Sequence, residues 1–214
     1  RNSVQYTTPT FNNFSGSALY STGENGVGPR AYNANIGVKY DDGAWFAALA
    51  YTRSTTGADN NSATSVSAFE KVSDLRAALT YRFSANTRIG LMYDRTDGDL
   101  TRAGSLAYGG SDLKQSVWYV NGALGIGDNG RIIAQYGQAG KLSGGNTTVA
   151  DSGKARHYTL GYEHDLSKRT LFKAIYSEIR NHRAANYDFG IGSIGGVAAG
   201  ADPRGFAVGL RHTF

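Results

Sequence analysis

The chain has 214 residues, including 29 glycines, 14 tyrosines and 9 phenylalanines but only 3 prolines and no cysteine, and its formal net charge is +5. The lack of cysteine excludes disulfide bonds and thiolate metal sites, and the charge is too modest and too dispersed for a nucleic-acid-binding stripe. Mean hydropathy is −0.38, and no stretch reaches the roughly 18 apolar residues of a membrane helix, whereas membrane-spanning β-strands, whose apolar positions only alternate, remain compatible with these values.

Eleven segments carry apolar residues at every second position, a pattern that predicts β-strands. In "LRAALTYRF", for example, Leu75 and Leu79 alternate with Arg76 and Arg82. Most segment lengths cluster near the roughly 9–11 residues of a tilted strand that crosses a bilayer. In chain order the predicted strands cover approximately residues 2–8, 14–21, 32–40, 45–53, 74–83, 88–96, 113–126, 131–139, 156–164, 170–179 and 205–214.

The connections alternate between short and long. Short connections such as "DDGA", "SANT" and "GDNG" alternate along the chain with long polar loops. Aromatic residues lie beside the short turns and, in a second set, towards the long loops. Outer-membrane barrels have these features, whereas a β-sandwich, the alternative, does not require them. We therefore predict an all-β, transmembrane antiparallel β-barrel, with long loops at 22–31, 54–73, 97–112, 140–155 and 180–204.

The two faces of the predicted strands differ in charge. Leu75, Leu79, Val208 and Leu210 are expected to face outwards, and the arginines between them inwards. Three acidic residues share the inward positions, namely Asp74, Asp94 and Glu163. Rings of arginine and lysine favour anions in pores, so we expect an anion-preferring lumen. The predicted pore-lining basic residues are Lys39, Arg76, Arg82, Arg88, Arg131, Lys173 and Arg211.

Three segments resemble the general porins of beta-proteobacteria: "NSVQYTTPTFNNFSGSALY" (2–20), "LGYEHDLSKRT" (160–170) and "GLRHTF" (209–214). The resemblance implies a homotrimeric barrel of 16 strands, lying in the outer membrane against lipid and lipopolysaccharide. It implies passive diffusion of small hydrophilic solutes without catalysis. The preference for anions is expected from the charges of the lumen, and we expect neither a cofactor nor a metal. The resemblance also implies that the last strand is an insertion signal, formed by Phe206, Val208, Leu210, His212 and Phe214.

The predicted strand count is odd, whereas the family places both termini in the periplasm, which requires an even count. We therefore expect residues 1–214 to be the C-terminal part of a single transmembrane β-barrel domain, supplying about the last 11 strands. The loop that narrows the pore in the family would then precede this segment.

Several patterns suggest other chemistry. "GIGDNG" (125–130) matches a dinucleotide-binding pattern, but a strand rather than a helix is predicted after it, so a tight turn is expected. Asp94, Asp97 and Asp99 lack the glutamate that would complete a calcium-binding EF-hand loop. Ser177 and His157 could be neighbours on adjoining strands, as a hydrolase in the barrel wall would require.

The chain thus leaves three classes of function open. A diffusion channel is the reading we prefer, and an enzyme in a barrel is the second. The third is an adhesive or structural surface protein, whose contacts would come from the long loops "GADNNSATSVSAFEKV" and "HRAANYDFGIGSIGGVAAGADPR". Ordinary porin loops have the same polar character, so the loops alone do not favour adhesion.

Overall fold

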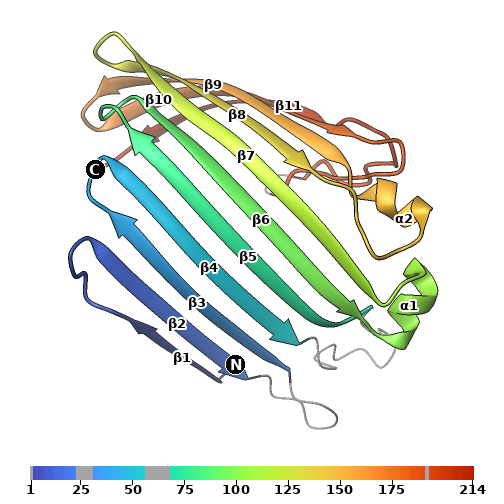
Figure 1. Cartoon of the computed structure of the whole chain (residues 1–214). Coiled ribbons are helices and arrows are strands. Elements are labelled where there is room, and N and C mark those ends of the chain that lie inside the picture. The colour runs from blue at the N-terminus through green and yellow to red at the C-terminus, as the bar shows by residue number, and fades with distance from the viewer. Residues whose placement is uncertain (1, 23–30, 56–67, 191–192) are drawn as a thin grey trace.

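A computed structural model describes residues 2–22, 31–55, 68–190 and 193–214. These form one 11-stranded antiparallel sheet in which every strand pairs with its neighbours in sequence. Figure 1 shows the sheet curving so that β9–β11 lie above and behind β7 in the view. The strands are β1 (Asn2–Thr7), β2 (Phe14–Thr22), β3 (Tyr32–Asp41), β4 (Trp45–Thr55), β5 (Phe69–Arg82), β6 (Arg88–Leu100), β7 (Asp112–Ile126), β8 (Gly130–Ala139), β9 (Ala155–Ser167), β10 (Thr170–Asn181) and β11 (Arg204–His212).

The strand register gives the sheet two different faces, which we call the apolar face and the polar face. On the apolar face, Leu79 lies opposite Leu91, which in turn lies opposite Val120. On the polar face, the neighbouring positions pair Thr80 with Gly90. Among the described residues, no large side chain is fully buried. The sheet therefore has no core of its own, and its apolar face matches the lipid-facing wall of a barrel.

The predicted sorting of leucines and arginines is observed. Leu75 and Leu79 lie on the apolar face of β5, and Arg76 and Arg82 occupy the alternate positions of the same strand. On β11, Val208 and Leu210 lie on the apolar face and Arg211 on the polar face. Leu210 is 68% exposed, as expected for a side chain that meets lipid rather than protein.

Aromatic side chains form two rows on the apolar face. One row lies near the short turns, where the rings of Phe14 and Tyr40 are 4.8 Å apart. The other lies towards the long loops, where the Tyr136 ring is 5.2 Å from both Trp118 and Tyr158. Two rows of amphipathic rings match the two interfaces of a membrane.

The connections divide the molecule into a turn end and a loop end, as Figure 1 shows. The C-terminus lies at the turn end, and the long connections lie at the loop end. "GIGDNG" is a tight turn between β7 and β8, with Gly127 at φ 58° and Ile126 paired with Gly130. The expected turn is thus confirmed, and the segment that follows is a strand rather than the helix of a dinucleotide site.

Two short helices interrupt the long loops, where the sequence patterns indicated only irregular chain. α1 (Arg102–Tyr108) begins after Thr101, whose side chain accepts a hydrogen bond from the Gly104 backbone, and α2 (Thr147–Ser152) begins after Asn146 in the same way. These caps satisfy N–H groups that a helix start leaves unpaired. The strands also extend further towards the loop end than predicted, most of all β5, which begins at Phe69. Within the described residues, none of the helices is long or apolar enough to span a membrane.

Candidate functional site

The polar face carries all seven basic residues that the sequence singled out. The register aligns Lys39 with Ala48, Arg76 with Asp94, and Arg88 with Arg82. Further along the sheet, Arg131 lies opposite Glu163, which lies opposite Lys173. Arg211 lies opposite Leu171 on the same face. Strand pairing alone therefore gathers side chains from β3 to β11 onto one wall.

The first group of charges lies at the turn end of β3–β6. Arg82 binds Asp41 through two hydrogen bonds, of 2.7 Å from Nη1 and 3.2 Å from Nη2. Such a forked contact holds a guanidinium in a fixed orientation. Arg88 lies directly opposite Arg82, and Lys39 is two residues before Asp41. The group thus combines three positive charges with one negative charge.

The second group crosses β8–β11, also near the turn end. Arg131 Nε donates to Glu163 Oε2 at 2.6 Å, and both side chains are largely buried. Lys173 flanks Glu163 on the other side. Arg211 and Asp165 both lie opposite Leu171, from its two neighbouring strands.

A third group lies nearer the loop end of β5 and β6, and it is negative. Arg76 Nε donates to Asp94 Oδ2 at 2.6 Å. Thr96 donates a 3.0 Å hydrogen bond to Asp74. One arginine here faces two carboxylates, so positive charge on the polar face is concentrated at the turn end.

The charge count from the sequence needs correction. Asp41 and Asp165 also lie on the polar face, so seven basic side chains face five carboxylates rather than three. Both lie at strand ends, outside the segments that were sorted by face. At the turn end, six basic residues face Asp41, Glu163 and Asp165. Four of the six form no ion pair with any described residue, namely Lys39, Arg88, Lys173 and Arg211.

Ser177 and His157 are neighbours on this face, as the sequence suggested. His157 Nε2 is 2.8 Å from Ser177 Oγ, and Thr159 Oγ1 is 3.0 Å from the same oxygen. The amide of Gln135 lies 3.4 Å from His157 Nδ1. A base and a hydroxyl are thus in contact, but the group beside the imidazole is a neutral amide.

The loop between β10 and β11 lies over this cluster. The Tyr187 hydroxyl donates to the Gly153 carbonyl at 3.1 Å and accepts a 2.8 Å hydrogen bond from Gln115. The Phe189 ring lies 6.3 Å from that of His157. Sequence reasoning missed this contact, which joins positions far apart in the chain.

The acidic and histidine side chains that could act as metal ligands do not lie together. Asp94, Asp97 and Asp99 each contact a separate basic residue. Within the described ranges, no three histidine, aspartate or glutamate side chains are placed to hold a metal ion. His164 and His212 lie on the apolar face at the turn end, beside Tyr162 and Phe214. His212 and Phe214 lie with Phe206, Val208 and Leu210 along the apolar face of the end of the chain.

Comparison with known proteins gives a consistent result. The family described as Gram-negative porin matches residues 1–184. The outer membrane porin protein 32 of Delftia acidovorans is 32% identical over 107 residues, which cover 49% of this chain and 28% of that protein.

Solved structures show the same fold. An anion-selective porin from Comamonas acidovorans superposes with a TM-score of 0.75 at 23% identity, covering 100% of this chain and 59% of that one. A loop-deletion mutant of OmpT, an outer membrane protein of Vibrio cholerae, has a TM-score of 0.65 at 14% identity, covering 98% of this chain and 62% of its own. The chain therefore spans less than two thirds of the length of these relatives.

Proposed function

The chain belongs to the Gram-negative porin family, and from that membership we propose that it forms the larger part of a water-filled channel through which small hydrophilic solutes and ions diffuse. Family membership also makes it an outer-membrane protein with a β-barrel fold. The observation that carries the proposal is the sorting of side chains: leucines and aromatic rings on one face, and a wall of charged and hydroxyl side chains on the other. A channel needs those two environments back to back.

We propose that the channel prefers anions. The support is the excess of basic residues at the turn end, where Arg88, Lys173 and Arg211 form no ion pair with a described residue. Uncompensated charges on a low-dielectric wall focus the field in the lumen. The Comamonas porin of the same fold is itself described as anion-selective.

The test is electrical and uses the full-length protein in a planar bilayer. Stepwise conductance is expected, with a reversal potential across a potassium chloride gradient whose sign corresponds to chloride permeation. A cation-selective reversal potential would refute the anion preference but would still support the proposed channel. The absence of conductance from a folded protein would favour the adhesive or structural alternative.

We propose that residues 1–214 are the C-terminal part of one barrel domain, whose remaining strands pair with β1 and β11. Both edges of the sheet lack a partner among the described residues, and an unpaired edge in lipid leaves backbone groups unsatisfied.

We further propose a homotrimer, with β11 near the contact between protomers. Monomers in mild detergent, with Phe206 and Val208 contacting only lipid, would contradict it.

We also propose that the cluster of His157 and Ser177 has no catalytic role. Ser177 lies within β10, where the backbone groups are paired to both neighbouring strands, so β10 itself offers no free pair of N–H donors for an oxyanion beside this hydroxyl. The 2.8 Å contact between the two side chains is nevertheless what an esterase would use. A fluorophosphonate probe is expected to leave Ser177 unlabelled, and stoichiometric labelling at that residue would establish the enzyme instead.

A further inference from the structure

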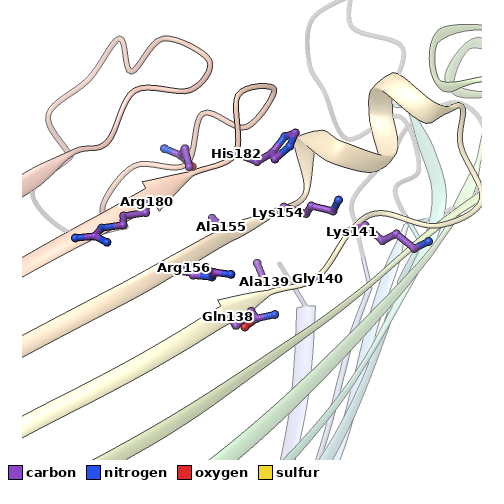
Figure 2. Close-up of a pocket in the computed structure, with 10 residues that line it drawn as sticks. Gln138, Ala139, Gly140, Lys141, Lys154, Ala155, Arg156, Arg180 and His182 are labelled. Atoms are coloured by element: carbon purple, nitrogen blue, oxygen red, sulfur yellow. The ribbon is translucent and has the colours of Figure 1, made fainter.

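A pocket of about 250 Å³ lies on the polar face near the loop end, beneath the loop between β10 and β11. Its floor is shallow, because Gly137 of β8 and the cross-strand pair of Ala139 and Ala155 put no more than a methyl group there. Figure 2 shows these two alanines side by side on their strands, at the edge of an adjoining pocket. Tyr119 and His157, which lie opposite Gly137 on its two neighbouring strands, form the walls. We call this cavity the lumenal pocket.

The roof of the lumenal pocket is aromatic and is held in place. The Phe189 ring lies over the His157 wall, as described above. Besides the two hydrogen bonds of its hydroxyl, Tyr187 donates its backbone N–H to Asn181 Oδ1 at 3.0 Å, and Asn181 Nδ2 donates to the Tyr187 carbonyl at 2.9 Å. The cavity is thus bounded by a loop that is tied to the wall.

The polar groups around the pocket are already paired within the protein. Both ring nitrogens of His157 contact side chains of the wall, at Ser177 and Gln135. The Asp188 carboxylate accepts hydrogen bonds from three backbone N–H groups of its own loop. Arg156 also lines the pocket, but its side chain belongs to the apolar face of β9. The lumenal pocket therefore offers a ligand apolar surface rather than a charge.

The shape and lining of the pocket indicate what kind of apolar group fits. A Cβ at Gly137 would come within 2.3 Å of the Tyr119 ring, so glycine is what lets this ring lie close against the wall. Tyr119, Tyr187 and Phe189 all line the cavity, and aromatic rings prefer offset or edge-on contact with other rings. Pockets for drug-sized ligands measure roughly 300–1,000 Å³, so the smaller lumenal pocket suits a single substituted ring.

We propose that the lumenal pocket binds the aromatic ring of a small neutral solute, while the polar part of that solute stays in the water of the lumen. The inference rests on the proposed channel and names a class of solute that the channel retains. A charged group in the pocket would lose its hydration without gaining a partner. An aliphatic group of the same size would fill the space but would lack the contact between rings.

The experiment uses the full-length protein in detergent micelles, with phenyl glucoside as the ring-bearing probe. Methyl glucoside is the same sugar without the ring, and cyclohexyl glucoside carries a ring that is not flat. Binding is measured by saturation-transfer difference NMR, with the strongest transfer expected at the phenyl protons. Cyclohexyl glucoside should bind more weakly, and methyl glucoside should show no binding. Equal transfer to ring and sugar protons, or equal binding of any two probes, would overturn the proposal.

Two variants change the pocket in different ways. Phe189→Ala removes a ring of the roof and is expected to weaken binding of phenyl glucoside about tenfold. Ala155→Leu fills the floor and should weaken it at least as much. Because Phe189 lies in a loop outside the strands, its variant guards against misfolding of the strand variant. Unchanged binding in either folded variant would contradict the proposed site.

The matched control is Ala50→Leu, the same substitution on the polar face of β4. Ala50 lies in the same cross-strand row as Ala155 but outside the pocket. This variant should bind phenyl glucoside as the wild type does, and an equal loss in it would overturn the assignment. Conductance of the wild type in potassium chloride is recorded separately, so that failure of ring binding and failure of the channel are distinguished.

Discussion

At the scale of single residues, the polar face contains two kinds of basic side chain. Arg82 and Arg131 form close ion pairs with Asp41 and Glu163, so their charge is largely compensated locally. Arg88 forms no ion pair with a described residue, and the residue directly opposite it is another arginine, Arg82. At physiological salt the field of a charge decays over about 8 Å. We therefore expect the unpaired residues to determine ion preference.

Arg88→Glu is expected to reduce anion preference. The substitution changes the local charge by two units in a wet lumen, where an effect near RT, roughly threefold in the chloride-to-potassium permeability ratio, is reasonable. Reversal potentials across a salt gradient measure it. Arg95→Glu, on the apolar face of β6, is the control and should change the ratio little. An unaltered ratio in R88E would rule out a turn-end ring as the source of selectivity.

The hydrogen bonds of Asp188 predict that the stability of the loop between β10 and β11 depends on pH. The backbone N–H groups of Gly195, Ile194 and Phe189 donate to its carboxylate and hold the pKa of that group below its ordinary value. A depressed pKa stabilises the folded loop above the unfolded value of about 3.9, and this stabilisation is lost as the pH falls through the folded pKa.

The corresponding variant is Asp188→Asn. At pH 7 its Gly195 amide should exchange with deuterium faster than that of the wild type, because the charged acceptor is gone. The two proteins should begin to converge as the pH falls below about 4, and should converge fully only below the depressed pKa of the folded loop. A constant difference at all pH values would show that the carboxylate charge does not hold this loop.

At the scale of elements, the two short helices are held by contacts between loops. Asn146, the residue that caps α2, donates its backbone N–H to the Tyr108 carbonyl of α1 at 2.8 Å. At Gly110, a Cβ would come within 1.7 Å of the Gly144 carbonyl oxygen. The loops that carry α1 and α2 therefore pack backbone against backbone, which only glycine allows at this point.

Gly110→Ala is expected to separate these two loops. The new methyl group cannot be accommodated against a backbone carbonyl, and overpacking of this kind costs about 1–3 kcal/mol. Limited proteolysis of residues 140–154 should be faster than in the wild type. Gly190→Ala is the matched control, because a Cβ there meets nothing within 4 Å. Equal cleavage of both variants would show that the contact does not hold the loops together.

For the molecule as a whole, the last residue makes few packing contacts with the described sheet. Phe214 is fully exposed and contacts His212 edge-on, with the ring centroids 5.0 Å apart. Its ring adds little to the packing of the described strands, so removing it can test a role other than packing. The resemblance implies such a role, as part of an insertion signal in the last strand, and this stays a prediction.

Phe214→Ala is expected to slow assembly without destabilising the assembled protein. The fraction of heat-modifiable, folded protein in the outer membrane shortly after synthesis should fall about tenfold, which corresponds to ~1.4 kcal/mol in an activation barrier. Phe83→Ala removes another exposed ring at the turn end and should assemble normally. If both variants assemble alike, the terminal ring is an ordinary girdle residue.

Residue patterns alone were enough to assign the strands, their order and their two faces. Alternation of side chains is a property of any extended strand, and short turns force consecutive strands to pair, so Leu79 and Arg76 could be assigned to opposite faces without coordinates. It also placed seven basic residues on one wall and indicated that His157 and Ser177 could be neighbours.

The folded arrangement, in contrast, was needed to learn which of those charges are compensated. Arg82 pairs with Asp41, which is 41 positions away in the sequence. A shift of one residue in the strand register would have placed Asp41 on the other face of the sheet. The alignment of Gln138, Arg156 and Arg180 across β8, β9 and β10 likewise requires three strands in one register. The helices α1 and α2 are too short for a periodic pattern and depend on contacts between distant loops. Such features depend on register and loop packing, which local residue patterns do not encode.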